Sequence, residues 1–170
     1  MTKIAFLMDP IETVAIKKDS TLAMIRAAQM RGMDVYYCRQ EDLVISDNRV
    51  CAYLSRLALV SHFAEALDPA SVNNGEDSWF TLASEELMPL STMDIVMMRK
   101  DPPFDMEYIY TTYLLERAES EGVRVVNRPG SLRDCNEKLF ATAFSECCPP
   151  LVVSRRLDVL KKFHAEHKNV

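Results

Sequence analysis

Short apolar runs, separated by segments with helical periodicity, most constrain the fold of this 170-residue chain. Strands with one face in water alternate apolar and polar residues, whereas unbroken apolar strands are covered on both faces. The runs lie at Ile4–Met8, Val35–Cys38, Ile95–Met98 and, interrupted by Arg124, Val123–Val126. They predict central strands of a sheet that helices cover on both sides.

Helical segments lie between these runs. One follows Asp19 and ends near Gly32, and a second begins at Asp105, since Asp caps helix starts and Gly helix ends. The second has a predicted buried stripe of Met106, Ile109, Tyr110, Tyr113 and Leu114. A third, opened by the capping-box pattern Ser131-x-x-Asp134 and stopped at Pro149-Pro150, has the apolar face Leu132, Cys135, Leu139, Phe140, Ala143 and Phe144. The alternation predicts an α/β fold, a three-layer, mainly parallel sheet with helices on both faces.

One segment interrupts this alternation. Leu43–Ile45 and Val50–Val60 flank the polar stretch Ser46-Asp47-Asn48-Arg49, which predicts an inserted hairpin. Residues 61–92 are the least regular part, and roughly residues 61–80 of them are interpreted as an insertion.

The character of the chain changes after Pro150. Leu151–Val153 predicts a strand, and Leu157, Leu160 and Phe163 form the apolar side of a predicted basic helix. We expect residues 1–130 to form one domain and residues 131–170 to be the truncated beginning of another.

Composition excludes several function classes. A hydrophobic content of 48% is enough for a core, and a net charge of −5 without a basic face argues against a nucleic-acid partner. Five apolar residues precede Asp9, fewer than the roughly 7–15 of a secretion signal or the roughly 20 of a membrane span. The five scattered cysteines predict reduced, buried and unpaired thiols in a cytoplasmic protein: Cys38, Cys51, Cys135, Cys147 and Cys148.

Polar residues follow three of the predicted strands, at Asp9-Pro10, Arg99-Lys100-Asp101 and Asn127-Arg128-Pro129. Ligands of open α/β sheets bind outside the carboxyl ends of the strands. Arg99 and Lys100 are donors for a carboxylate or phosphate, while Asp101 can accept from an ammonium group or hold a cationic neighbour. Charges at strand ends are also common as solvated loop residues, so both interpretations stay open.

The loop before the first helix offers a second set of donors. Its residues Lys18 and Ser20, with backbone N–H groups, can face an anion, although a simple helix cap explains them as well. The four isolated glycines allow neither G-x-G-x-x-G nor a P-loop, and His164 and His167 lie in no metal-ligand pattern.

Three longer stretches resemble the bacterial glutathione synthetases: MDPIETVAIKKDST at 8–21, MRKDPPFDMEYIYTTYLLERAE at 98–119 and VNRPGSLRDCNEKLFA at 126–141. The resemblance implies the N-terminal portion of an ATP-grasp ligase, with a Rossmann-like domain followed by the start of the ATP-grasp domain. It implies that the complete enzyme joins γ-glutamylcysteine to glycine through an acyl phosphate, with ATP and Mg²⁺, as a homo-oligomer.

The resemblance also implies residue roles. Lys138 in RDCNEKL is an expected ligand of an ATP phosphate, and Arg99, Lys100 and Asp101 are expected on the peptide-substrate side. From the donors of their loop, we expect Lys18 and Ser20 to bind substrate as well. The glycine-rich ATP lid and the Mg²⁺ ligands of the family lie past the end of this chain, so we expect the chain alone to be inactive. Two alternatives stay open: another ATP-grasp carboxylate-amine ligase, and a non-catalytic α/β binding module.

Overall fold

The computed structural model describes residues 1–16, 18–60, 79–135 and 139–168. The chain divides into two compact units, Met1–Arg133 and Asp134–Val170. The predicted domains, residues 1–130 and the beginning of an ATP-grasp domain at residues 131–170, stay a prediction. In the described part of the chain, no helix has both the length and the apolar character needed to span a bilayer.

The first unit is built around one mixed sheet. Its described strands lie in the order β3-β4-β2-β1-β7-β8, and β5 and β6 also pair with β4. The strands are β1 (Lys3–Leu7), β2 (Asp34–Cys38), β3 (Leu43–Ser46), β4 (Arg49–Leu59), β5 (Phe80–Leu82), β6 (Glu86–Pro89), β7 (Ile95–Met98) and β8 (Arg124–Val126). Short 3-10 turns lie at η1 (Ile11–Thr13), η2 (Gln40–Asp42) and η4 (Leu90–Thr92). The predicted α/β class is confirmed.

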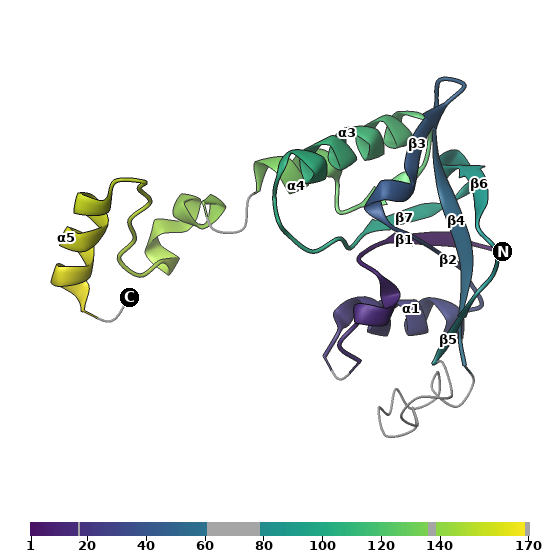
Figure 1. Ribbon diagram of the computed structural model, residues 1–170, viewed down its shortest axis with the longest axis horizontal. Coiled ribbons are helices and arrows are strands. Elements are labelled where there is room, and N and C mark those ends of the chain that lie inside the picture. Colours follow the sequence, from purple (N-terminus) through teal and green to yellow (C-terminus); the bar gives the residue numbers. More distant parts are fainter. Residues whose placement is uncertain (17, 61–78, 136–138, 169–170) are drawn as a thin grey trace. The chain divides into compact units, whose positions relative to one another are not determined.

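Among the described strands, parallel pairing is confined to β2-β1-β7-β8, the strands predicted from the apolar runs. Helix α1 (Ser20–Met30) joins β1 to β2, and α3 (Met106–Ser120) joins β7 to β8. The two crossovers run in opposite directions along the sheet. Because such crossovers are right-handed, the two helices must cover opposite faces, as Figure 1 shows. The predicted three layers are therefore present.

Strand β1 shows why its sequence is apolar throughout. Ile4, Phe6 and Met8 pack in the core under α1, whereas Ala5 and Leu7 pack in the core under α3. Successive side chains of a strand point to opposite faces, so a strand between two helical layers has no polar face.

The predicted hairpin is confirmed as β3 and β4. Asp47 and Asn48 between them both have positive φ, which is the pattern of a type I′ turn. The long β4 pairs antiparallel with each of β2, β3, β5 and β6. The predicted parallel sheet thus extends into an antiparallel half.

The predicted starts of the first two helices are confirmed. The carboxylate of Asp19 accepts from Leu22 N at 2.8 Å, and that of Asp105 accepts from Tyr108 N at 2.9 Å. Gly32 follows the end of α1 with φ of +70°, a conformation that glycine adopts without strain.

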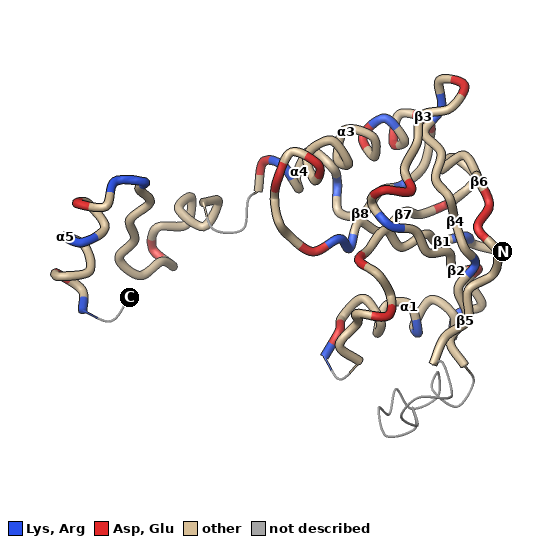
Figure 2. Tube along the Cα trace, in the orientation of Figure 1, with Lys and Arg blue, Asp and Glu red and all other residues tan. Residues whose placement is uncertain are grey.

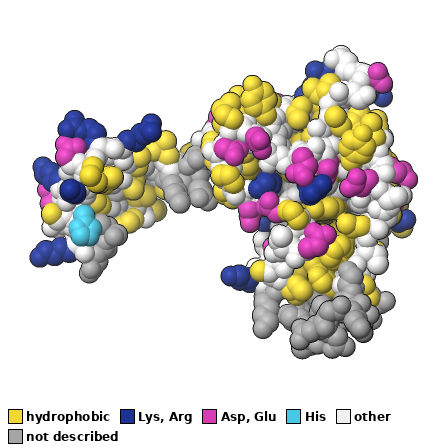
Figure 3. Space-filling view, viewed as in Figure 1, with side chains coloured by type: hydrophobic (Ala, Val, Ile, Leu, Met, Phe, Trp, Pro, Cys, Tyr) yellow, Lys and Arg dark blue, Asp and Glu magenta, His cyan; other side chains and the backbone are white. Residues whose placement is uncertain are grey.

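The predicted apolar stripe of α3 is wrong in part. Leu114 packs against the core and Ile109 is half-buried, but the other three residues are exposed. Exposure reaches 61% at Met106, 62% at Tyr110 and 50% at Tyr113, and Figure 3 shows hydrophobic side chains on the surface over α3. The residues buried against the sheet are Thr111, Thr112, Leu115 and Ala118. The threonine hydroxyls donate to the carbonyls of Glu107 and Ile109, so their burial leaves no hydrogen bond unmade.

The third predicted helix is also wrong as a continuous element. Helix α4 (Pro129–Asp134) begins two residues before Ser131, since Pro suits a first helical position. The 3-10 segment η5 (Phe140–Cys147) follows with a non-helical Phe144, and residues 136–138 lie outside the described part. Phe140 and Phe144 are 44% and 50% exposed. An apolar stripe without tertiary packing rarely keeps a helix regular.

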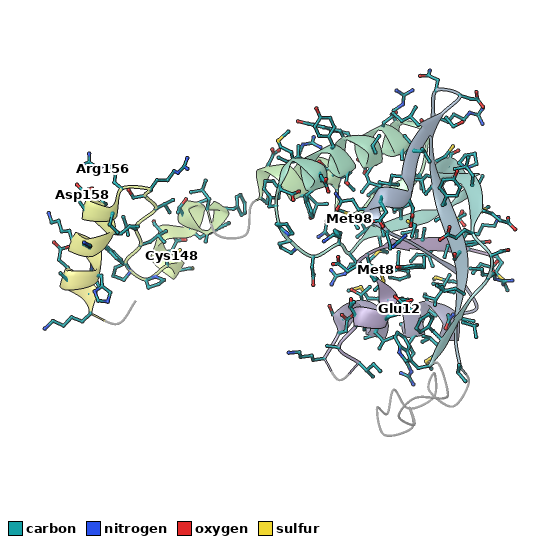
Figure 4. The ribbon with its side chains drawn as sticks, in the orientation of Figure 1. Met8, Glu12, Met98, Cys148, Arg156 and Asp158 are labelled. Carbon is teal, nitrogen blue, oxygen red and sulfur yellow. The ribbon has the colours of Figure 1, made fainter. Side chains whose placement is uncertain are left out.

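The second unit confirms one of the two elements predicted after Pro150. Helix α5 (Leu157–His167) is present, with Arg156 paired to Asp158 at its start, as Figure 4 labels. Leu151–Val153, however, is in no strand. A strand needs a neighbour to pair its backbone groups, and no strand is found among residues 134–135 and 139–168.

Candidate functional site

The carboxyl ends of β1 and β7 lie side by side near the labelled Met8 and Met98 in Figure 4. Arg99 N donates to Leu7 O at 2.7 Å, which ties the first residue after β7 to the end of β1. The crossovers leave these adjacent strands in opposite directions. This pair is therefore the topological switch point, where open α/β sheets form a ligand crevice.

Arg99 reaches from this point to the first turn of α1. Its Nε donates to Thr21 Oγ1 at 3.1 Å and a terminal nitrogen donates to Ser20 Oγ at 2.9 Å. The structure thus brings together Arg99 and Ser20, predicted separately from distant segments. A guanidinium has five N–H donors, so these two bonds orient it and leave others for a ligand.

Lys100 is held by the neighbouring strand. Its Nζ lies 2.9 Å from Asp9 Oδ1 and donates to the carbonyl of Asp101 at 2.7 Å. The backbone N of Asp101 donates to Asp9 Oδ2 at 3.0 Å. Asp9, Lys100 and Asp101 therefore form one hydrogen-bonded network, and Arg99 with Ser20 and Thr21 forms a second. Because Asp9, Thr21, Arg99 and Asp101 line the same small pocket, the two networks lie side by side and are together called the strand-end cluster. Figure 2 shows basic and acidic positions together in the loop between β7 and α3.

Tyr108 stands beside this cluster and was not among the predicted site residues. Burial raises the pKa of Tyr108, while the positive charges of Lys100 and Arg99 act to lower it. With a raised pKa the phenol keeps its proton at neutral pH and can donate a hydrogen bond. The sequence prediction placed neighbouring residues in the core stripe and so passed over this position.

Two pockets flank the cluster. One of about 70 Å³ is lined by residues that include Asp9, Thr21 and Arg99. The other, of about 380 Å³, is lined by Gln40, Glu41, Lys100, Glu107, Tyr110, Thr111 and Leu114. Small-molecule sites have roughly 300–1,000 Å³. The larger pocket has the volume and the mixed charge that suit a zwitterionic small molecule.

Other predicted site residues are not joined to the cluster. Lys18 is exposed, and its backbone N–H donates to Ala15 O. Arg128, predicted at the third strand end, contributes its carbonyl to α4 as acceptor for Leu132 N. Lys138 lies outside the described residues. Two further residues, Asp9 and Thr21, belong to the cluster but were not predicted as site residues. Asp9 could have been predicted, because it follows the end of a strand.

The cysteines differ in part from prediction. All five are free, with Cys38 and Cys51 buried as predicted, but Cys135 and Cys147 are exposed and Cys148 is intermediate. Burial raises the pKa of the Cys38 thiol far above its usual range, so that thiol is unreactive.

Among residues 1–16, 18–60, 79–135 and 139–168, no group of three or more His, Cys, Asp or Glu side chains is placed to hold a metal ion.

Comparison with known proteins decides the family. The model of the prokaryotic glutathione synthetase N-terminal domain matches residues 2–133, which include β1, β7 and the whole strand-end cluster. The chain belongs to this family.

Full-length relatives agree with the domain match. The glutathione synthetase of Pseudomonas putida is 48% identical over 168 residues, which cover 99% of this chain and 49% of that protein. Those of Yersinia pestis and Escherichia coli K12 are 44% and 41% identical over the whole chain, covering 49% and 50% of their lengths. The chain spans about half the length of the relatives it matches.

Proposed function

We propose that this chain supplies the peptide-substrate side of a glutathione synthetase, a ligase that joins γ-glutamylcysteine to glycine in the cytoplasm as a homo-oligomer. The observation that carries the proposal is the cluster of Arg99, Lys100 and Asp9 at the switch point of a domain of this family. The relatives are named for glutathione synthesis, which indicates the substrate class.

The dipeptide matches the charges around the cluster. γ-Glutamylcysteine carries two carboxylates and one ammonium group. Arg99 and Lys100 offer the donors for the carboxylates, and Glu41 and Glu107 in the larger pocket offer acceptors for the ammonium group. Asp9 lines the smaller pocket and Lys100 the larger, so their ion pair joins the two. We propose that the dipeptide lies across this pair.

The other predicted residues take supporting roles. Ser20 orients Arg99 through its hydroxyl, and Asp101 holds Lys100 through its carbonyl. Lys18, exposed in the loop before α1, adds positive charge near that end of the sheet. These roles place the substrate and leave the bond-forming chemistry to other groups.

The reaction needs an activated carboxylate. Phosphorylation of the dipeptide's cysteinyl carboxylate, with release of ADP, gives an acyl phosphate; the glycine amine then displaces phosphate and forms the peptide bond. We propose that Lys138 binds an ATP phosphate. We propose that the complete enzyme uses ATP with Mg²⁺. Because this chain covers 49% of the Pseudomonas putida relative, we propose that residues 1–170 alone make no glutathione.

The experiment joins residues 1–170 to the remaining half of the Pseudomonas putida protein, to which this chain is 48% identical. ADP release by this joined enzyme is measured with γ-glutamylcysteine, glycine and Mg²⁺. We expect ADP release to require both peptide substrates, and residues 1–170 alone to release none. A cooperatively folded joined enzyme without dipeptide-dependent ADP release would contradict the ligase assignment and favour a non-catalytic binding module.

Lys138→Ala in the joined enzyme should raise the KM for ATP or lower kcat by roughly 10- to 150-fold. The removed group is a charge-assisted donor to phosphate, worth about 1.5–3 kcal/mol. KM for γ-glutamylcysteine should stay unchanged. Lys161→Ala, on exposed α5, is the matched control. Normal ATP kinetics in Lys138→Ala would remove Lys138 from the nucleotide site.

A further inference from the structure

The Asp9 carboxylate uses both of its oxygens on the loop that follows β7. Oδ1 pairs with Lys100 Nζ at 2.9 Å, and Oδ2 accepts from the backbone N of Asp101 at 3.0 Å. Asp9 itself follows β1. One side chain therefore connects the two strand ends that form the crevice.

Lys100 needs such a partner because its side chain is only 19% exposed. A lysine side chain is a flexible four-carbon stem with a strongly hydrated charge, and it adopts a single position only when its ammonium group is held. That group has three N–H donors. Asp9 and the Asp101 carbonyl take two of them, which fixes the direction of the third.

We infer that Asp9 is a positioning residue for the dipeptide: it fixes Lys100 so that the third N–H group meets a substrate carboxylate. The inference rests on the proposed function. Asp9 does not contact the reacting atoms and acts through Lys100.

A double-mutant cycle tests this inference in the joined enzyme, with Asp9→Asn, Lys100→Gln and the double variant. Asparagine still offers an oxygen to Asp101 N but brings no charge to Lys100. We expect each single variant to raise the KM for γ-glutamylcysteine about tenfold, with kcat changed less than twofold. The double variant should show no larger KM than either single variant, because both remove the same interaction.

Asp34→Asn is the matched control. Asp34 forms an ion pair with Arg56 that links β2 to β4 at the amino end of β2, away from the crevice. The KM of the Asp34→Asn variant for γ-glutamylcysteine should equal that of the unsubstituted enzyme. Asp9→Glu keeps the charge, so its KM should lie within about threefold of that of the unsubstituted enzyme. If Asp9→Asn no longer unfolds cooperatively on heating, Asp9→Glu tests the positioning role in its place.

The outcomes separate this inference from the proposed function. Independent effects that multiply in the double variant, or a tenfold rise that Asp9→Glu does not reduce, would overturn the positioning role. An unchanged KM in Asp9→Asn beside a raised KM in Arg99→Ala would overturn it while the proposed function stands. Unchanged KM values in both would overturn the proposed function itself.

Discussion

Arg99→Ala should raise the KM for γ-glutamylcysteine about 10- to 150-fold in the joined enzyme. The removed guanidinium is oriented by Ser20 and Thr21 and has further N–H groups for a carboxylate. A hydrogen bond to a charged group contributes about 1.5–3 kcal/mol, and each 1.36 kcal/mol is a factor of ten. Steady-state kinetics with the dipeptide varied at saturating ATP and glycine measures the change.

The control for Arg99→Ala is Arg31→Ala. Arg31 lies at the other end of α1 and donates to the carbonyl of Ala27. The Arg31→Ala variant should leave the KM for γ-glutamylcysteine unchanged. This result would separate a general loss of positive charge from the loss of a substrate contact. Arg99→Lys should recover only part of the affinity for the dipeptide. Lysine keeps the positive charge but lacks the planar guanidinium that donates to both hydroxyls. An unchanged KM in Arg99→Ala would show that the dipeptide binds elsewhere.

Local signals in the sequence predicted much of the fold. The caps at Asp19 and Asp105 each bond a backbone N–H three residues away, so their chemistry is contained within four residues. The apolar strands were predicted for a similar reason, since cover on both faces removes polar residues from the strand itself. Neither signal needs knowledge of distant segments.

The phase of α3 could not be predicted in this way. Hydrophobicity alone favours Tyr110 and Tyr113 over Thr111 and Thr112 as buried residues. The threonines pack against the sheet instead, because they are small and their hydroxyls donate to carbonyls of their own helix. The side chain of Tyr113 instead lies under the guanidinium of Arg133 at 4.7 Å, a contact made at the surface of the unit.

The sequence predicted which residues belong to the candidate site but not which of them contact one another. Strand ends indicated Arg99, Lys100 and Asp101, but Asp9 and Asp101 are 92 residues apart in the chain. Their contact depends on β1 and β7 being neighbours, which strand order decides and local sequence does not. Asp101 contacts Lys100 through its backbone carbonyl and not through its carboxylate, and the ion pair with Lys100 is made by Asp9.

The largest effect on stability is expected for Phe6→Ala, which should lower the free energy of unfolding by about 3–5 kcal/mol. Phe6 is fully buried in β1 and packs in the core under α1 with Leu22 and Ile25. Truncation leaves a cavity that the central strand of a two-sided sheet cannot close by moving, because it is packed on both faces. Unfolding of residues 1–170 in urea, followed by circular dichroism, measures the loss.

A matched control is Ile45→Ala, at a residue 51% exposed on β3, which should cost less than about 1 kcal/mol. The loss at Phe6 also reaches the site. Helix α1 carries Ser20 and Thr21, so a helix that packs less firmly on β1 holds Arg99 less firmly. In the joined enzyme, Phe6→Ala that still folds should therefore raise the KM for γ-glutamylcysteine, while Ile45→Ala should not. A Phe6→Ala variant as stable as Ile45→Ala would show that α1 does not depend on β1 for its position, and the proposed coupling of core to crevice would be wrong.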